Sequence, residues 1–175
     1  MRVNEILNTH TTMQDPGTAE LAVNDAAEAA KFEHVTFTYK DAGAPSLTDI
    51  TFTARPGETI GVIGGTGSGK STLIDLVCRF YDADNGGVAL FGHDVKQYSF
   101  AQLRRLVGVV PQQAVLFTGT IRDNMQWAAP GASDEEIWQA LEIAQAAEFV
   151  RGKPGMLDAP VETAGRNFSG GSASA

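Results

Sequence analysis

Nine residues in the first half of the chain, Gly64 to Thr72, constrain its fold more than any other stretch. They read GGTGSGKST and satisfy the spacing G-x-x-x-x-G-K-[ST]. Their glycines allow positive φ and let backbone amide hydrogens approach an anion where a Cβ would obstruct it. Apolar runs at 59–63 and 73–77 flank them. The pattern predicts a strand, a phosphate-binding loop and a helix whose positive end faces the anion.

The residue types in this loop indicate its ligand. Lys70 is expected to reach the β and γ phosphates of a nucleotide, and the Ser71 hydroxyl to ligate Mg²⁺. The alternative is a glycine-rich turn that meets the pattern by chance, which the flanking strand and helix make less probable. We therefore expect a nucleoside triphosphate with Mg²⁺ to bind here. The predicted contacts are Gly64, Gly65, Thr66, Gly67, Ser68, Gly69, Lys70, Ser71 and Thr72.

Composition restricts the possible partners. The 175 residues carry a formal charge of −8, whereas broad nucleic-acid or anionic-membrane binding needs a basic excess. We therefore expect no nucleic-acid partner. One cysteine, Cys78, excludes an internal disulfide framework and is typical of a reducing compartment. No apolar run of about 18 residues is present, so the chain as given is expected to be soluble and cytoplasmic.

The rest of the chain reads as alternating strands and capped helices. Residues 1–30 are polar and resemble a connector. Residues 31–39 alternate, which places Phe32 and Val35 on opposite faces of a strand. Further strands are expected at 47–54, 88–91 and 107–110, the last a continuous apolar run of buried type. N-cap pairs Ser99/Gln102, Thr120/Asp123 and Ser133/Glu136 each open a helix. The predicted class is α/β, with short antiparallel strands leading to a buried parallel one.

Three smaller features lie at informative positions. Tyr39 could stack on an adenine held by the loop, or could simply pack its ring on the sheet. Gln112 follows the 107–110 strand, where an amide can reach Mg²⁺ or the attacking water, although a plain polar loop residue is the alternative. Residues 167–171, NFSGG, offer a hydroxyl and backbone amides as a second anion cradle, or form a flexible tail.

Together these motifs resemble the nucleotide-binding domain of ATP-binding cassette exporters of the multidrug and lipid type. The order and spacing match from about residue 32 to 171, and the block PQQAVLFTGTIRDN at 111–124 is its specific part. The resemblance implies a P-loop ATPase fold with an antiparallel β subdomain and part of a helical subdomain. It disfavours a nucleotide kinase or a chromosome-structure ATPase.

The resemblance also assigns roles. Tyr39 would stack on adenine, and Gln112 would link the site to the transport domain. Ser169, Gly170 and Gly171 would be the signature loop, which contacts the γ-phosphate held by a second nucleotide-binding domain in a head-to-tail dimer. Residues 1–30 would be the connector from a transmembrane domain, 31–171 a partial nucleotide-binding domain, and 133–171 its helical subdomain with the signature loop. The parent protein would lie at the cytoplasmic face of the plasma membrane.

The chain departs from the family pattern at its end. Ser172 stands where the family signature has glutamine, and the Mg²⁺-ordering aspartate, general-base glutamate and switch histidine do not follow. We hypothesise that residues 172–175, SASA, are an aberrant frameshift tail, because codons CAG CGC CAG CGC read as Ser-Ala-Ser-Ala after loss of one C. A cloning scar or a linker is the alternative. Two functions stay open, the ATP-binding subunit of an exporter and a nucleotide-binding fragment without ATPase activity.

Overall fold

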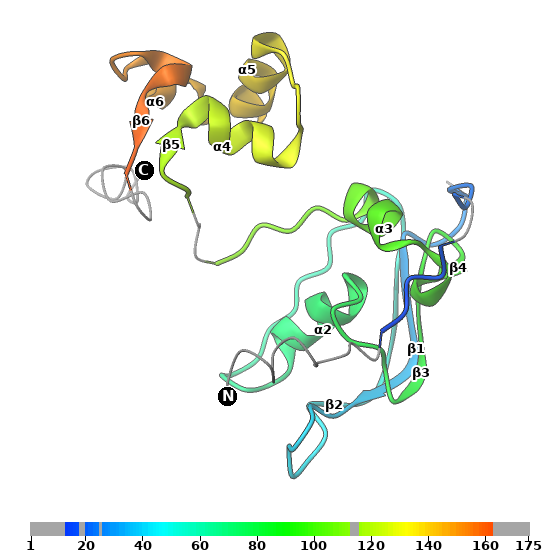
Figure 1. Ribbon diagram of the computed structural model, residues 1–175. Helices are drawn as coiled ribbons and strands as arrows, with labels where there is room; N and C mark the ends of the chain where they lie inside the picture. Colours follow the sequence, from blue (N-terminus) through cyan, green and yellow to red (C-terminus); the bar gives the residue numbers. More distant parts are fainter. Residues whose placement is uncertain (1–12, 18–19, 25, 113–115, 163–175) are drawn as a thin grey trace, which may run out of the picture. The chain divides into compact units, whose positions relative to one another are not determined.

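The computed structural model describes residues 13–17, 20–24, 26–112 and 116–162, which form two compact units divided between Val109 and Val110 (Figure 1). Each unit has an apolar core of its own. The expected division into connector (1–30), partial domain (31–171) and tail (172–175) stays a prediction. Residues 1–12 and 163–175 lie outside the described part of the chain.

The first unit is built on a four-stranded antiparallel sheet with the order β2-β1-β3-β4. Its strands are β1 (Ala30–Phe37), β2 (Leu47–Ala54), β3 (Asn85–Leu90) and β4 (His93–Asp94). The strands expected at 31–39, 47–54 and 88–91 are therefore confirmed to within a few residues. Strand β1 lies inside the sheet, and its pairing with β2 and β3 holds the sheet together.

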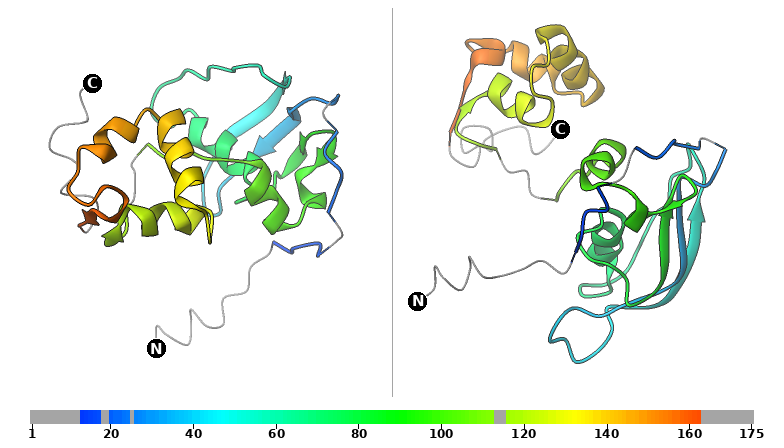
Figure 2. Two further views of the ribbon diagram at one scale, coloured as in Figure 1. Left: turned by 90° about the horizontal axis from the view of Figure 1, so that it is seen from above. Right: turned by 45° about the vertical axis from the view of Figure 1, so that its right-hand side comes forward.

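Two helices, α2 (Lys70–Val77) and α3 (Phe100–Leu106), cover one face of this sheet, and a short 3₁₀ turn, η1 (Val95–Gln97), precedes α3 (Figures 1 and 2). The Ser99 hydroxyl accepts from the Gln102 amide, which confirms the predicted start of α3. Leu76 of α2 and Leu103 of α3 pack on the sheet. Tyr98 is also fully buried there, and its hydroxyl donates to the carbonyl of Leu90 at 2.7 Å.

Irregular residues on the paired strands β1 and β2 interrupt the alternation of side chains between the two faces of the sheet. His34 and Asp49 both adopt a left-handed φ of 51°, and the register shifts between Phe32 and Val35. The extra residue moves the following side chains to the other face, as a β-bulge does. Phe32 and Val35 are consequently both buried at 0% exposure in one core, so the prediction that they occupy opposite faces is wrong.

Two expected buried strands do not form. Residues 59–63 and 107–110 are extended but belong to no strand, and Ile63 and Val110 are 97% and 96% exposed. A parallel strand needs neighbours along its edges to pair its backbone and cover its side chains. The described part of the chain offers these two segments none. The prediction of a buried parallel strand beside the loop is therefore wrong for this structure.

The second unit is mostly helical. Its elements are β5 (Gly119–Thr120), α4 (Ile121–Ala128), α5 (Asp134–Ile143), α6 (Ala147–Arg151), η2 (Met156–Asp158) and β6 (Pro160–Val161), with β5 and β6 antiparallel. Both predicted capping boxes, Thr120/Asp123 and Ser133/Glu136, are confirmed at the starts of α4 and α5. None of the helices described here has the length and apolar character needed to cross a bilayer.

One arginine joins three elements of this unit. Arg122 of α4 donates from Nε to Asp158 Oδ1 at 2.9 Å and also pairs with Asp134 at the start of α5. The hydrogen bond from Arg122 lowers the pKa of Asp158, and the bonds to Asp158 and Asp134 raise the pKa of Arg122. Charge pairing therefore supplements the small apolar core of the second unit.

Replacing Phe32 tests the core of the first unit. Phe32→Ala should lower the free energy of unfolding by about 3–5 kcal/mol, because it leaves a cavity around a fully buried ring. Urea unfolding followed by circular dichroism measures this change. Phe80→Ala is the matched control, since that ring is 60% exposed and its loss should cost far less. Equal losses for the two variants would contradict the packing described here.

Replacing Arg122 tests the charge pairing in the second unit. Arg122→Gln should lower its melting midpoint at pH 7 by roughly a few degrees. A depressed pKa means that Asp158 stabilises the fold above its ordinary pKa and loses this effect as the pH falls. The difference from the parent protein should therefore shrink below about pH 4. Tryptophan fluorescence reports this unit, which holds both tryptophans, and Arg104→Gln in the first unit is the control.

Candidate functional site

The predicted phosphate loop runs directly into the amino end of α2. Gly69 is the N-cap residue with φ 85° and ψ 7°, and no side chain caps the helix. The first backbone amides of a helix have no intrahelical acceptor, so an uncapped amino end favours an anion. Gly67 also has a positive φ, of 81°. Both glycines thus adopt a conformation that other residues reach only with strain.

The position of Gly69 also depends on close packing. A Cβ built at Gly69 would come within 2.6 Å of both Leu47 Cδ2 and the carbonyl oxygen of Ser46. Glycine therefore allows the junction of loop and helix to rest against the start of β2. The loop residues before it are exposed, which leaves their backbone accessible to a ligand.

Lys70 is turned onto the loop. Its Nζ donates to the carbonyl oxygens of Gly64 at 2.8 Å and Gly65 at 2.7 Å, and to Ser68 Oγ at 3.3 Å. Three neutral acceptors hold the ammonium group of Lys70 over the loop. This arrangement can attract a phosphate group to the same small region.

The two hydroxyl residues after Lys70 have different surroundings. Ser71 is exposed in the first turn of α2, whereas Thr72 is buried at 4% exposure. Among the described residues, no three acidic, histidine or cysteine side chains form a cluster suited to a metal ion. Mg²⁺ commonly takes one or two protein oxygens together with phosphate oxygens and water. An exposed hydroxyl beside a phosphate loop is compatible with that donor set.

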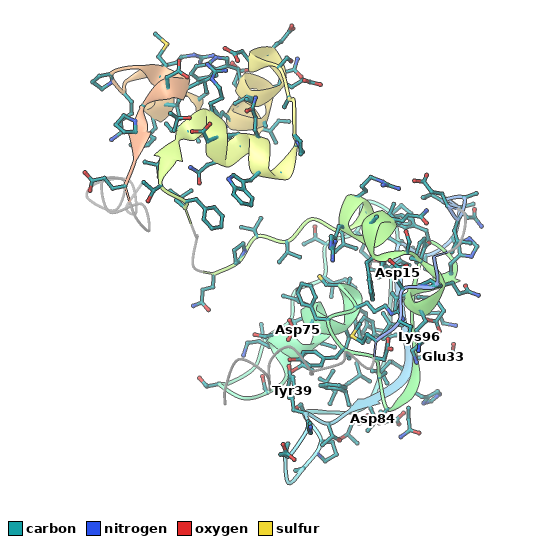
Figure 3. All side chains as sticks on the ribbon, viewed as in Figure 1. Asp15, Glu33, Tyr39, Asp75, Asp84 and Lys96 are labelled. Carbon is teal, nitrogen blue, oxygen red and sulfur yellow. The ribbon has the colours of Figure 1, made fainter. Side chains whose placement is uncertain are left out.

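Tyr39 lies beside the same helix, just beyond β1. Its hydroxyl oxygen is 3.1 Å from Thr72 Oγ1 and 3.1 Å from Asp75 Oδ2. Figure 3 shows Tyr39 and Asp75 next to each other. The ring makes edge contacts with Phe37 and Tyr81, at centroid distances of 4.9 and 5.1 Å. The structure thus brings Tyr39 and Thr72, two of the predicted contacts, into direct contact.

The protonation state of Tyr39 follows from these neighbours. The Thr72 hydroxyl is the largest single influence and lowers the pKa of Tyr39, but burial and the Asp75 carboxylate together raise that pKa above its ordinary value. The phenol therefore keeps its proton at neutral pH. It donates to the Asp75 carboxylate, which can only accept when ionised.

The remaining predicted contacts belong to the second unit or lie outside the described residues. Gln112 is an exposed residue of the second unit. Its predicted role in contacting Mg²⁺ or water stays a prediction. Ser169, Gly170 and Gly171 lie outside the described residues, and so do residues 1–12, 18, 19 and 25 of the predicted connector at 1–30.

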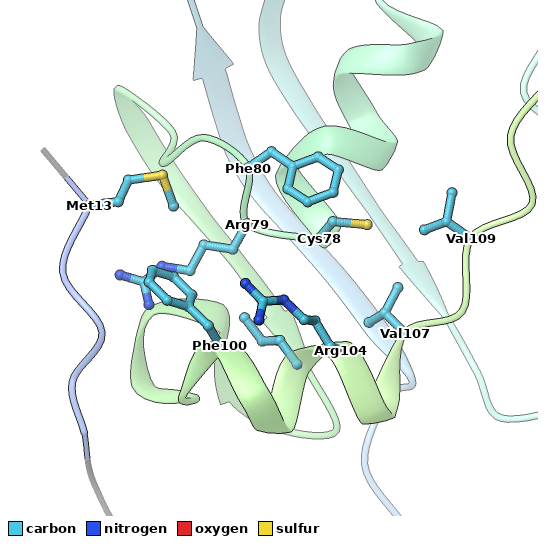
Figure 4. Close-up of a pocket in the computed structure, with 9 residues that line it drawn as sticks. Met13, Cys78, Arg79, Phe80, Phe100, Arg104, Val107 and Val109 are labelled. Carbon is cyan, nitrogen blue, oxygen red and sulfur yellow. The ribbon is translucent and has the colours of Figure 1, made fainter. Parts of the chain in front are cut away.

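A separate cavity of about 300 Å³ lies between the end of α2 and α3 (Figure 4). It contains none of the predicted site residues. Arg79 lines it and is 6% exposed, with Nη2 donating to the carbonyl of Gln14 and Nε to Asp82. Its guanidinium lies 5.1 Å from the Phe100 ring centroid. Burial raises the pKa of Cys78 beside it, so this thiol is protonated and unreactive.

Sequence reasoning did not find the contact between Tyr39 and Asp75. The two residues are 36 positions apart, and no short motif links them. Helical spacing gives one usable signal, because Thr72 and Asp75 are three residues apart and face the same side of α2. Asp75, about one helical turn after Thr72, could therefore have been named from the sequence as a candidate neighbour of the site.

Comparison with protein families gives one model that matches residues 47–175, described as ABC transporter. An uncharacterized ABC transporter ATP-binding protein of Mycobacterium tuberculosis is 39% identical over 173 residues. A similar protein of Bacillus subtilis, YfiB, is 37% identical over 170 residues. Each match covers 97% of this chain and 29% of the relative. The chain therefore spans less than a third of the length of these relatives.

Two further similarities concern exporters. A Staphylococcus aureus protein named as a multidrug export ATP-binding/permease protein is 40% identical over 139 residues, which are 79% of this chain and 24% of that protein. Among solved structures, a bacterial Atm1-family ABC exporter with ATP bound matches with a TM-score of 0.85 and 32% identity. That match covers 97% of this chain and 30% of the exporter chain.

Replacing Gly69 tests the loop geometry. Gly69→Val should sharply weaken binding of a nucleoside triphosphate, because positive φ costs a β-branched residue about 1–3 kcal/mol and its Cβ meets Leu47 and Ser46. Isothermal titration calorimetry measures the affinity. Gly61→Val is the matched control, since a Cβ there meets no atom within 4 Å. Unchanged affinity in Gly69→Val would show that the loop does not form the binding site.

Proposed function

Because this chain belongs to the ABC transporter family, we propose that it is the ATP-binding part of an exporter, and that in complete form the protein couples ATP binding and hydrolysis to transport across a membrane. The observation that carries this proposal is the phosphate loop itself. Gly69 opens α2 without a side-chain cap, and Lys70 lies over the loop carbonyls. The loop thus combines an uncapped helix amino end with an ammonium group, and both features favour a bound phosphate.

In this proposal different loop residues contact different parts of the nucleotide and its Mg²⁺. Backbone amides of residues 64–69 and the amino end of α2 surround the phosphates. Lys70 neutralises the β and γ phosphates, and the Ser71 hydroxyl supplies one ligand to Mg²⁺, which offsets the charge of the phosphates. The buried Thr72 hydroxyl lies one residue further along the same turn. Together these groups can hold a triphosphate on a protein of net charge −8.

Tyr39 is proposed to contact the adenine. Its ring sits beside α2 through the hydrogen bond to Thr72, which supports its position near a nucleotide held by the loop. An aromatic face can stack on a base regardless of the base's hydrogen-bonding edge. Gln112 is proposed to contact Mg²⁺ or the attacking water when it approaches the phosphates. Its exposure leaves the amide available for this contact.

The proposed partners follow from the family. A second nucleotide-binding domain would pair head to tail with this one, and Ser169, Gly170 and Gly171 would contact the γ-phosphate held by that domain. A transmembrane domain would place the assembly at the cytoplasmic face of a membrane. The exporter relatives, a multidrug export ATP-binding/permease protein and an Atm1-family exporter, support export as the direction of transport.

A second candidate function is binding without turnover by these 175 residues on their own. The sequence contains no apolar run followed by Asp-Glu that could supply a general base. General-base assistance is typically worth about 10²–10⁴-fold in rate. A chain that holds the phosphates but lacks this carboxylate would bind ATP and hydrolyse it very slowly.

Replacing Lys70 tests both candidates in one experiment. Lys70→Ala should abolish measurable Mg-ATP binding, because it removes the ammonium group that the structure places over the loop. Lys96→Ala is the control, since this exposed lysine lies beyond β4 and away from the loop. Titration calorimetry gives the affinity and phosphate release gives the rate.

The rate separates the two candidates. Phosphate release that depends on Lys70 and proceeds at the rate of complete ATPase domains would contradict binding without turnover. Tight binding without phosphate release supports it. Equal ATP binding by the parent protein and Lys70→Ala would contradict the proposed site altogether.

A further inference from the structure

Asp75 of α2 touches the predicted nucleotide site in addition to Lys70, Ser71 and Thr72 of the same helix. Its Oδ2 lies 3.1 Å from the hydroxyl oxygen of Tyr39, which is also 3.1 Å from Thr72 Oγ1. Thr72 and Asp75 are three residues apart, so both side chains face Tyr39 from one side of the helix. The Tyr39 hydroxyl is thus held at two points by α2.

The direction of these hydrogen bonds follows from the chemistry of the groups. An ionised carboxylate can only accept, so the Tyr39 hydroxyl donates this hydrogen bond to Asp75. The Tyr39 oxygen can then accept from the Thr72 hydroxyl. A bond to a charged acceptor is stronger than one between neutral groups. Asp75 is therefore the main partner that orients the phenol.

The rest of the tyrosine is held by aromatic neighbours. Phe37 and Tyr81 are 4.9 and 5.1 Å from the Tyr39 ring centroid, at interplanar angles of 84° and 89°. Such edge contacts hold the sides of the ring. The hydroxyl end, by contrast, is confined by two hydrogen bonds. The tilt of the ring plane depends on Asp75 and Thr72.

We propose that Asp75 is a positioning residue for nucleotide binding, which holds the ring of Tyr39 in the orientation that receives the base. This role rests on the proposed function of the chain as an ATP-binding domain. Asp75 acts through Tyr39, whereas the hydrogen bonds of Lys70 go to the loop. Its effect is therefore confined to the base end of the ligand.

Two ligands separate this role from a general effect on folding. ATP carries a base, and inorganic tripolyphosphate presents a similar chain of phosphates without one. Asp75→Ala should weaken ATP binding by about fivefold, the usual size of one lost hydrogen bond, and leave tripolyphosphate binding unchanged. Asp75→Asn keeps an acceptor oxygen and should recover most of the ATP affinity. Titration calorimetry on the full 175-residue chain, with Mg²⁺ present, measures the affinity of the parent protein and both variants for each ligand.

A double-mutant cycle tests whether Asp75 acts through the tyrosine hydroxyl. Tyr39→Phe removes only that hydroxyl and should weaken ATP binding as much as Asp75→Ala does. The double variant should then bind no more weakly than either single variant. Additive losses would overturn the proposal. Thermal unfolding of each variant confirms folding, and Asp75→Leu, which also removes the acceptor but keeps a side chain of similar size, replaces Asp75→Ala in the cycle if the alanine variant does not fold.

The possible failures can be told apart. Equal losses for ATP and tripolyphosphate in Asp75→Ala, or no loss for ATP, would overturn the positioning role and leave ATP binding by the parent chain intact. If the parent chain binds neither ATP nor tripolyphosphate, the proposed function fails, and the positioning role fails with it.

Discussion

The contact between Gly69 and the first residues of β2 is the constraint on which the candidate site depends. The carbonyl of Ser46 and the side chain of Leu47 occupy the space where a Cβ at position 69 would lie. The loop can approach the sheet this closely only because residue 69 has no side chain and tolerates φ 85°. The amino end of α2 is thereby held against the start of β2, and no side chain caps it.

The sheet that contains β2 is held by its inner strand β1. Phe32 and Val35 of β1 are fully buried, and facing irregularities at His34 and Asp49 place both in the same core. Leu76 packs against this core from α2, one residue beyond Asp75. Packing of Leu76 therefore sets the rotation of α2 about its axis. That rotation turns Thr72 and Asp75 toward Tyr39.

The second unit is stabilised differently. Its helices are short, with α5 the longest at 10 residues, so backbone propensity alone would not keep them folded. Two capping boxes satisfy amides at the starts of α4 and α5, and Arg122 joins α4 to α5 and η2. Buried residues such as Ile137 and Leu141 supply its core. Local hydrogen bonds and one charge network thus supplement a small apolar interior.

Sequence patterns correctly predicted those structural features that depend only on residues close together in the chain. The glycine pattern at 64–69, the caps at Ser99, Thr120 and Ser133, and the strand at 47–54 all depend on residues within a few positions of one another. Such signals work because caps and turns satisfy backbone groups without distant partners. The family resemblance, which rested on the order of these signals, is confirmed by the matches.

Features that need a partner far away in the sequence were decided by the tertiary structure. The apolar runs at 59–63 and 107–110 are exposed because hydrophobicity makes a strand only when another strand pairs with it. A left-handed residue at His34 overrides alternation, since a bulge depends on pairing with β2. The bond from Tyr39 to Asp75 spans 36 positions and exists only because β1 and α2 pack on one core. The sequence by itself determined the family and the phosphate-loop pattern at 64–72, because both depend on residue types at fixed spacing, and the fold decided how Tyr39 is oriented beside α2.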